Sequence, residues 1–204
     1  MVYRITRRIL LALARSFFQL RVVGKEHIVT EGGLFIASNH ESYLDPPLVA
    51  FGYDFPIHFL ARKTLFRGPA AWFYPIINAH PIDQDNPDRA GLKMVIDLLK
   101  SGKQVVVFPE GARTEDGNLQ PAEPGTGLIL ARTKVKVQPV RIFGARECLP
   151  RGSGKVRFNP ITVVVGEAFE VPEELLKSRE KDRYQRIADL VMEKVAALEV
   201  PTDR

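Results

Sequence analysis

Short apolar runs of strand length, separated by segments with helical periodicity, constrain the fold of this sequence more than any other feature. Four runs have the length of a single buried strand, namely 34–38, 57–60, 105–108 and 137–142, and a longer run covers 156–165. Runs that are short and continuously apolar are typical of strands covered on both faces. We therefore predict one largely buried sheet.

Helical patterns lie between these runs. The segment 87–100 has Asn86 as a cap, Pro87 in its first turn and Gly102 just past its end, and similar patterns cover 125–132 and 183–198. Alternating strands and helices predict an α/β fold with a mixed sheet flanked by helices. A chain of 204 residues is long enough for one sizeable domain and short for two, so we predict a single domain. The mixed charge run 173–186 is interpreted as a solvated helical face.

The amino-terminal residues 2–20 form a basic amphipathic pattern. One face of the predicted helix is apolar and carries Val2, Ile5, Ile9, Leu13, Phe17 and Leu20. The opposite stripe is basic and carries Arg4, Arg8 and Arg15. The arginines leave no run near the roughly 20 apolar residues that span a bilayer, so we predict a peripheral helix on an anionic membrane surface. Packing against its own domain is the alternative, although Leu10, Leu11 and Phe18 widen the apolar surface beyond one packing face.

Composition limits the partners and the cofactors. The net charge of +5 favours anionic partners, but the basic residues outside the amino terminus are scattered and no nucleic-acid motif accompanies them, so we predict no nucleic acid partner. Cys148 is the only cysteine and the four histidines do not cluster, so we predict neither a metal site nor a bound cofactor. No secretory signal is recognisable, which indicates an intracellular protein.

An uncharged aromatic segment, 68–82, contains Trp72, Phe73 and Tyr74. Core packing explains most such segments. A wall of an apolar channel and a lipid-facing surface are the two other readings that its size allows.

His40 and Asp45 follow the first predicted strand. A neutral imidazole can take a proton from a hydroxyl near pH 7, and a carboxylate on its other nitrogen fixes the tautomer and stabilises the imidazolium. In such a pair the nucleophile would be a hydroxyl of the substrate. The spacing alone also allows a structural role, because Asp45 before Pro46 and Pro47 is a good helix start.

A second loop with the same placement follows the strand at 105–108 and reads Pro109-Glu110-Gly111-Ala112-Arg113-Thr114. Glycine lets backbone amides approach an anion, and an arginine can bind a phosphate through two parallel hydrogen bonds. A surface turn with an ion pair is the structural alternative. Ligands bind at the ends of strands in α/β sheets, and two such loops in one chain favour a single site.

Taken together, these residues resemble the glycerolipid acyltransferase family, in particular the bacterial 1-acylglycerol-3-phosphate acyltransferases. The resemblance runs from about residue 22 to 169. Asn39-His40 with Asp45 looks like the first family block, the stretch 108–114 like the third, and Val137-Gln138-Pro139-Val140 like the fourth. The basic pair Arg62-Lys63 also sits where family members place a basic residue. The resemblance implies an acyltransferase domain at 21–204, with a glycerol-3-phosphate acyltransferase-like fold, after the membrane helix at 1–20.

The resemblance also implies the reaction. His40 would be the general base and Asp45 its orienting partner, without an acyl-enzyme intermediate. The donor would be an acyl carrier protein or coenzyme A thioester, and the acceptor a lyso-glycerolipid, chiefly 1-acylglycerol-3-phosphate, giving phosphatidic acid at the cytoplasmic face of the membrane. The implied substrate-binding residues are Glu110, Gly111, Arg113, Thr114, Lys63 and Pro139. Ser42 lacks the Gly-x-Ser-x-Gly elbow of a nucleophilic serine.

Two departures from the family pattern concern the headgroup. Gln84 follows Ile82-Asp83 where the second family block usually ends in arginine, and Glu123 replaces a lysine usual after the third block. Both lower the positive charge near the expected phosphate, so another lysophospholipid or a lyso-aminolipid is an alternative acceptor. An acyl thioesterase that uses water is a further alternative. The sequence does not determine acyl length, donor type or oligomeric state.

Overall fold

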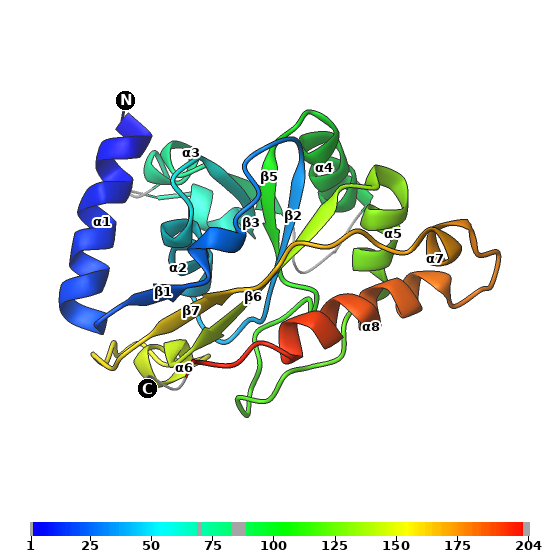
Figure 1. Ribbon diagram of the computed structural model, residues 1–204. Helices are drawn as coiled ribbons and strands as arrows, with labels where there is room; N and C mark the ends of the chain where they lie inside the picture. Colours follow the sequence, from blue (N-terminus) through cyan, green and yellow to red (C-terminus); the bar gives the residue numbers. More distant parts are fainter. Residues whose placement is uncertain (1, 69–70, 83–88, 202–204) are drawn as a thin grey trace.

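A seven-stranded mixed sheet runs through the computed structural model, which describes residues 2–68, 71–82 and 89–201 (Figure 1). The strand order is β1-β7-β6-β2-β5-β3-β4, and every described neighbouring pair is parallel except β6 with β7. The strands are β1 (Arg21–Val23), β2 (Leu34–Ser38), β3 (Ile57–Arg62), β4 (Ala79–Ile82), β5 (Gln104–Val107), β6 (Lys136–Phe143) and β7 (Thr162–Val165). The predicted single-domain α/β fold with a mixed sheet is confirmed.

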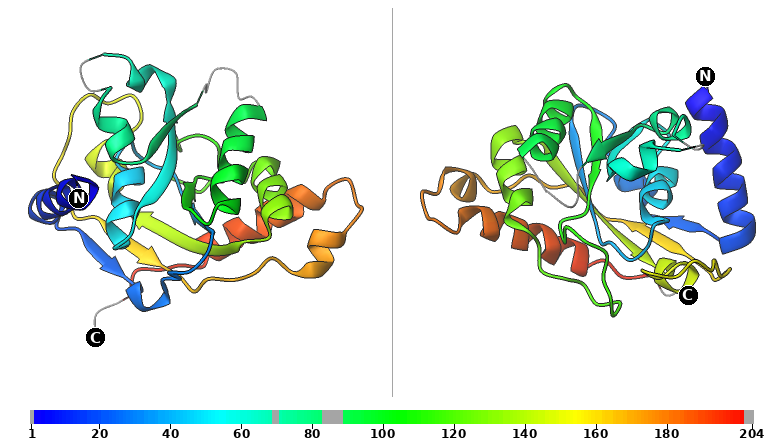
Figure 2. Two further views of the ribbon diagram at one scale, coloured as in Figure 1. Left: turned by 90° about the horizontal axis from the view of Figure 1, so that it is seen from above. Right: turned by 180° about the vertical axis from the view of Figure 1, so that it is seen from behind.

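Helices cover both faces of the sheet (Figure 2). One core contains buried side chains of α1 and α2, and the other contains those of α4, α5 and α8. The helices are α1 (Val2–Phe18), η1 (Lys25–His27), α2 (Asp45–Gly52), η2 (Lys63–Phe66), α3 (Phe73–Ile76), α4 (Arg89–Lys100), α5 (Pro124–Thr133), α6 (Ala145–Cys148), α7 (Glu173–Lys177) and α8 (Arg183–Ala196). The expected first turn of α4 at 87–88 lies outside the described residues.

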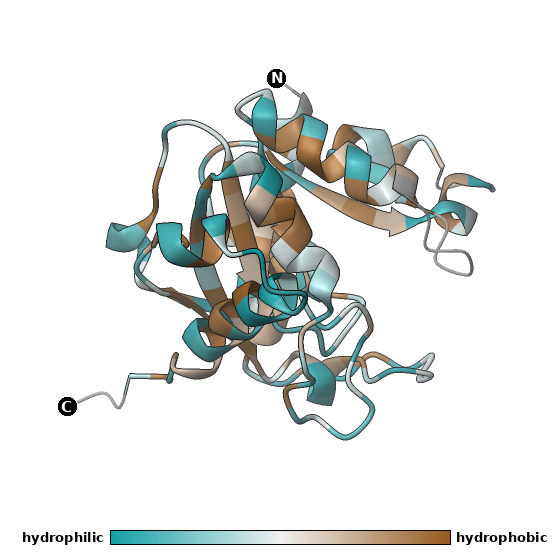
Figure 3. Cartoon of the chain, turned by 90° about the vertical axis from the view of Figure 1, so that its right-hand side faces the viewer, coloured by the Kyte–Doolittle hydropathy of each residue, from teal (hydrophilic) through white to brown (hydrophobic). Residues whose placement is uncertain are grey.

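The central strand β2 shows why its sequence is continuously apolar. Leu34 and Ile36 point into the core beneath α1 and α2, whereas Phe35 and Ala37 point into the core beneath α4, α5 and α8. Because successive side chains of a strand point to opposite faces, both sets must be apolar when both faces are covered. Figure 3 shows the result, with hydrophobic residues along the central strands and mixed hydropathy along the helices.

Several local predictions were wrong or incomplete. The apolar run at 156–165 is a strand only at Thr162–Val165; its first part is an irregular exposed loop. Pro160 has no N–H to donate to a ladder, which limits how early the strand can begin. The charge run 173–186 forms α7, a turn and the start of α8, and the short strands β1 and β4 were not predicted.

Helix α1 is apolar on two sides. Leu10, Leu11 and Phe18 pack against the core, and the largely buried Arg7 side chain donates to the Phe51 carbonyl at 3.1 Å and pairs with Asp54 at 3.0 Å. The exposed part of the predicted apolar face is the row Ile5, Ile9, Leu13 and Phe17, which are 51, 56, 47 and 51% exposed. Leu20 is buried, and the side chains of Val2 and Arg4 lie outside the described set.

The packing reading therefore describes one side of α1, whereas the other side stays exposed and its contact with a membrane remains a prediction. The predicted boundary at residue 20 falls between α1 and β1, two elements that are both packed on the rest of the chain. Within the described residues, no helix combines the length and apolar character needed to cross a membrane.

Candidate active site

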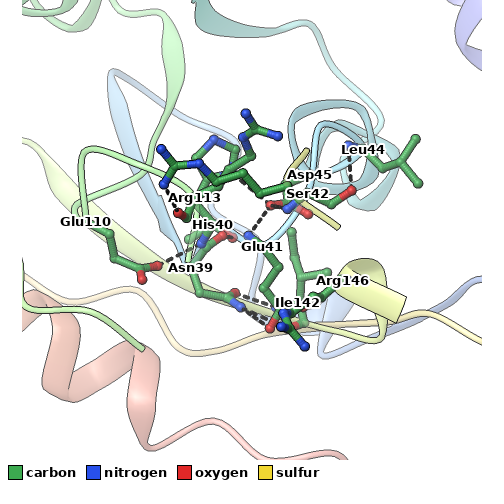
Figure 4. A network of polar contacts seen from close by, with 12 residues as sticks. Asn39, His40, Glu41, Ser42, Leu44, Asp45, Glu110, Arg113, Ile142 and Arg146 are labelled. Carbon is green, nitrogen blue, oxygen red and sulfur yellow. Dashed lines mark hydrogen bonds and ion pairs between the residues drawn. The ribbon is translucent and has the colours of Figure 1, made fainter. Parts of the chain in front are cut away.

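The two motif loops meet at one edge of the sheet. Strands β2 and β5 are parallel neighbours, with Leu34 opposite Gln104 and Ala37 opposite Val107, so their carboxyl ends lie side by side. The loop that follows β2 carries His40, and the loop that follows β5 carries Glu110 and Arg113 (Figure 4). The strand pairing therefore brings the two predicted motifs into one site, as expected for an α/β sheet.

His40 and Asp45 form a direct pair. The His40 Nδ1 lies 2.8 Å from Asp45 Oδ2, which also accepts the backbone N–H groups of Glu41 at 2.6 Å and Ser42 at 2.7 Å. Asp45 is fully buried and begins α2 without making a side-chain cap bond. An ionised carboxylate cannot donate, so Nδ1 carries the proton and Nε2 is left to accept one. The His40 side chain is 17% exposed and stacks on Phe108, with ring centroids 4.0 Å apart.

The second loop fixes the backbone of His40 on both sides. Glu110 Oε1 accepts the His40 N–H at 2.7 Å, and the Thr114 N–H donates to the His40 carbonyl at 2.8 Å. The other Glu110 oxygen accepts the Gln120 N–H at 2.8 Å. Burial raises the pKa of the Glu110 carboxyl, and these two amide bonds oppose the rise. Glu110 and Thr114 are both buried, so their contacts here hold the histidine in place.

Gly111 and Arg113 lie at the exposed end of this loop. Gly111 adopts a φ of 71°, which favours glycine, and its N–H donates to the Phe108 carbonyl at 3.1 Å. That amide closes the turn and is not free to bind an oxyanion. The Arg113 guanidinium lies 3.5 Å from the centroid of the Tyr43 ring. Its Nη1 is buried and has no hydrogen-bond partner among the described residues, so the hydrogen-bonding capacity of this donor is unused.

The sequence analysis did not predict the hydrogen bonds that hold the loop carrying His40 in place. Asn39 bonds Ile142 twice, donating to its carbonyl at 3.0 Å and accepting its N–H at 2.7 Å, and it donates to Glu41 Oε1 at 3.0 Å. Burial, with repulsion from Asp45 as the next largest cause, raises the pKa of Glu41 to about 7. Tyr43 beneath Arg113 was also missed. The contact of Asn39 with β6 arises because β2 and β6 are neighbours in the sheet, and the sequence pattern does not reveal which strands are neighbours.

The remaining predicted residues lie at different depths. Lys63 is exposed in η2, directly after β3, and β3 pairs in parallel with β5, so Lys63 belongs to the same edge of the sheet. Pro139 is buried inside β6 opposite Ala37, and its carbonyl accepts the Gly166 N–H at 2.9 Å. Pro139 therefore lies within the sheet, whereas the other predicted residues lie in loops at its edge.

Of the two residues that depart from the family pattern, Glu123 lies among the described residues. Glu123 donates its backbone N–H to the Pro109 carbonyl at 2.8 Å, and its Cγ lies 3.1 Å from where a Cβ on Gly111 would be. Its side chain thus packs against the Gly111 turn. Gln84 lies outside the described residues. Ser42, rejected as a nucleophile, is buried and donates its hydroxyl to the Leu149 carbonyl at 2.9 Å.

An apolar cavity of about 350 Å³ lies among α1, α2 and α3. Leu44, the neighbour of Asp45, lines it, as do Phe73 and Tyr74 of the uncharged segment. Leu13 and Phe17 of the exposed row also line it. The cavity thus extends from the exposed side of α1 to the residue that precedes Asp45, although neither His40 nor Asp45 lines it. In the part of the chain that the structure describes, no group of three or more His, Cys, Asp or Glu side chains is arranged to hold a metal.

Comparison with known proteins finds relatives in sequence and in fold. A protein of Bacillus subtilis named 1-acyl-sn-glycerol-3-phosphate acyltransferase is 27% identical over 191 residues, which cover 91% of this chain and 90% of that protein. The chloroplastic 1-acyl-sn-glycerol-3-phosphate acyltransferase LPAT1 of Arabidopsis thaliana is 29% identical over 155 residues, covering 73% of this chain and 43% of that protein.

Among solved structures, the 1-acyl-sn-glycerophosphate acyltransferase PlsC of Thermotoga maritima superposes with a TM-score of 0.72 and 24% sequence identity. The match covers 97% of this chain and 83% of that one, and it supports the fold. Residues 19–143, which contain both motif loops, match the family described as Acyltransferase. Since this match covers more than half of the 204 residues, the chain belongs to the acyltransferase family.

Proposed function

We propose that this enzyme transfers an acyl chain from an acyl carrier protein or coenzyme A thioester to the free hydroxyl of 1-acylglycerol-3-phosphate, giving phosphatidic acid. The observation that carries the proposal is the 2.8 Å contact of His40 with the buried Asp45 at the meeting point of the two loops. Among the described residues, no Ser, Thr or Cys side chain is hydrogen-bonded to the His40 ring. The nucleophile is therefore a hydroxyl of the acceptor.

In this mechanism His40 Nε2 takes the proton of the acceptor hydroxyl while the oxygen attacks the thioester carbonyl. The tetrahedral intermediate collapses by breaking the carbon–sulfur bond, and the leaving sulfur takes the proton from the imidazolium. Asp45 fixes the tautomer and stabilises the imidazolium while it exists. General-base catalysis of this kind typically contributes about 10²- to 10⁴-fold to the rate.

The acceptor phosphate binds Arg113. Its buried, unpartnered Nη1 supports this assignment, because a charged donor without a partner gains most from an anionic ligand. Each such charge-assisted bond contributes about 1.5 to 3 kcal/mol. Lys63, exposed at the same sheet edge, adds positive charge. Gly111 keeps the turn open beside Arg113, whereas Glu110 and Thr114 act through the backbone of His40.

The apolar cavity receives an acyl chain. It reaches Leu44, the residue that precedes Asp45, and its walls are chiefly aliphatic and aromatic. Burying a chain there gains about 0.8 kcal/mol per methylene. The exposed row of α1, with Arg8 and Arg15 also exposed, supports the proposal that the enzyme binds peripherally to an anionic membrane at its cytoplasmic face, where a lyso-lipid acceptor resides.

A second acceptor class is favoured by one observation. The Glu123 side chain packs against the Gly111 turn, close to where the headgroup would bind, and a carboxylate there disfavours a doubly charged phosphate. A lysophospholipid or a lyso-aminolipid is therefore the alternative acceptor.

The test is an assay of the purified protein with both thioester donors and a panel of lyso-lipids, with products identified by mass spectrometry. The proposal expects diacyl product, with lysophosphatidic acid the best acceptor. Preference for a lyso-lipid without a phosphate monoester would establish the alternative acceptor. Release of free fatty acid alone, whatever the acceptor, would identify a thioesterase and refute the transferase.

A further inference from the structure

The loop at 150–159, between α6 and β7, has an alternating basic and apolar sequence that the proposed function does not use. Val156 is 49% exposed and Phe158 is 63% exposed. The side chains of Lys155, before Val156, and of Arg157, between Val156 and Phe158, are exposed as well. No carboxylate of the described residues pairs with either of these two basic side chains. Exposed apolar residues flanked by unpaired positive charge are unusual on a surface that meets only water.

Phe158 joins this loop to α1. Its ring centroid lies 5.1 Å from that of Phe17 and 5.6 Å from that of Phe18, and the Ile161 N–H donates to the Phe18 carbonyl at 2.9 Å. The views agree that the loop lies beside the carboxyl end of α1 (Figures 1 and 2). The exposed row of α1 therefore continues into the loop. We call this surface the composite patch, consisting of Ile5, Ile9, Leu13, Phe17, Val156 and Phe158.

We propose that the loop at 150–159 is a second membrane-binding element, and that the composite patch binds an anionic lipid bilayer as one surface. Charge complementarity selects this partner, because the exposed Lys155 and Arg157 alternate with Val156 and Phe158 in the loop, and Arg8 and Arg15 add exposed positive charge elsewhere on α1. Apolar insertion combined with basic residues at the headgroups is how peripheral proteins bind such membranes. The inference rests on the proposed function, because that function requires a membrane-embedded acceptor.

The same loop reaches the candidate phosphate site. The Arg151 guanidinium donates to the Arg113 carbonyl at 3.3 Å and pairs with Glu115 at 3.0 Å. From Arg151 to Phe158 the chain spans at most about 25 Å. The loop therefore connects the backbone of the headgroup-binding arginine with the membrane patch. Binding through both α1 and this loop sets Arg113 at the level of the lipid headgroups, with the cavity beside Leu13 and Phe17 open toward the acyl chains.

The first test is sedimentation of the full-length protein with vesicles of phosphatidylglycerol and phosphatidylcholine. Phe158→Ser should lower the fraction bound to phosphatidylglycerol vesicles about tenfold. Lys155→Glu and Arg157→Glu should each lower it at least about fivefold, and less so at high salt. The matched control is Lys181→Glu, in the exposed turn between α7 and α8 at the opposite end of the molecule (Figure 1), which should change nothing. Thermal unfolding verifies that each variant folds.

A second measurement reads contact directly. Trp72 is the only tryptophan, so a Trp72→Phe background allows single tryptophans to be introduced by Phe158→Trp or, as a control, Lys181→Trp. Bromolipid vesicles should quench the tryptophan at 158 and not the one at 181. Binding of all loop variants at the wild-type level, with no quenching at 158, would overturn the proposal. If the fluorescence of the tryptophan at 158 instead changed with rising protein concentration in the absence of vesicles, the partner of the loop would be a second copy of the chain. That result would also overturn the proposal.

These results separate the loop from the reaction. Lipid binding that depends on the loop, in a protein that transfers no acyl group, would refute the proposed function alone. Wild-type lipid binding by the loop variants, with transferase activity intact, would refute the role of the loop alone.

Discussion

Two histidines of this molecule make ring hydrogen bonds of nearly equal length to very different partners. His40 Nδ1 lies 2.8 Å from a carboxylate oxygen of Asp45, whereas His58 Nδ1 lies 2.9 Å from Nε2 of His80 on the neighbouring strand β4. Burial, together with the smaller effects of His80 and Lys103, lowers the pKa of His58 to about 4. Burial also lowers the pKa of His80.

The length of the ring hydrogen bond therefore does not distinguish the two histidines, whereas the charge of the partner does. An imidazolium at position 40 would face a buried carboxylate, whereas one at position 58 would face a neutral ring and the field of Lys103. The first environment stabilises the charged intermediate of proton transfer and the second opposes it. The predictions below test this contrast, beginning with the largest expected effect.

Asp45→Asn removes the charge from the catalytic pair and keeps the shape of the side chain. We expect kcat to fall about 100-fold or more with little change in KM, because only the transition state contains the imidazolium. The control is His58→Asn, which alters the other pair and should leave kcat within about threefold. Steady-state kinetics with lysophosphatidic acid check both variants, and equal losses of kcat would remove the contrast between the two pairs.

Arg113→Gln and Glu110→Gln separate binding of the acceptor from positioning of the base. Arg113→Gln should raise KM for lysophosphatidic acid about 10- to 100-fold, because the variant loses one charge-assisted contact. It should have little effect on KM for an uncharged lyso-lipid. Glu110→Gln should lower kcat instead, because its carboxylate holds the His40 backbone. A rise in KM from Glu110→Gln at unchanged kcat would make Glu110 a substrate ligand.

Glu41 is adjacent to His40, yet burial disfavours its charged form as it does for His58. Its pKa is about 7 in the folded state and about 4.5 when unfolded, so the folded state holds the extra proton between these values. Stability therefore falls as pH rises from 4.5 to 7. Glu41→Gln should be about 2 kcal/mol more stable than wild type at pH 8 and equal at pH 4.5, as measured by urea unfolding. A difference that does not vary with pH would contradict this.

The His58 pair has the opposite pH dependence. The folded pKa of about 4 lies below the ordinary value of 6.5, so the stabilising contribution of neutral His58 is complete above pH 6.5 and is lost as pH falls toward 4. Because His58 is partly exposed, solvent screening reduces the expected loss to about 1 kcal/mol. His58→Asn should lose less stability than wild type between pH 7.5 and 4.5. Identical losses in urea unfolding would show that the pair does not titrate with folding.

The contrast also shows what the sequence could predict. Apolar runs located the central strands, and the His40 and Glu110 loops followed because glycine, proline and charged residues come directly after those runs. The sequence allowed the partner of His40 to be predicted, because Asp45 is close to it in sequence. It did not allow the partner of His58 to be predicted. The partner of His58 depends on parallel pairing of β3 with β4, and β4 is too short to leave a clear pattern.

Contacts between residues that are far apart in sequence could not be predicted for the same reason. Asn39 contacts Ile142 because β2 and β6 are neighbours, and nothing local to either residue indicates that pairing. The apolar run at 156–165 misled because periodicity does not distinguish a buried strand from an exposed loop. Val156 and Phe158 belong to that loop, and their apolar character follows from the surface that we propose they bind.

The most direct test of the account is the rate of a single turnover by His40→Ala with a saturating thioester donor and lysophosphatidic acid. The account predicts a rate at least about 100-fold below wild type, in a protein that unfolds at the wild-type temperature and binds both substrates as wild type does. A variant that forms phosphatidic acid at the wild-type rate would contradict the assignment of His40 as the base, and with it the distinction between the two histidine pairs.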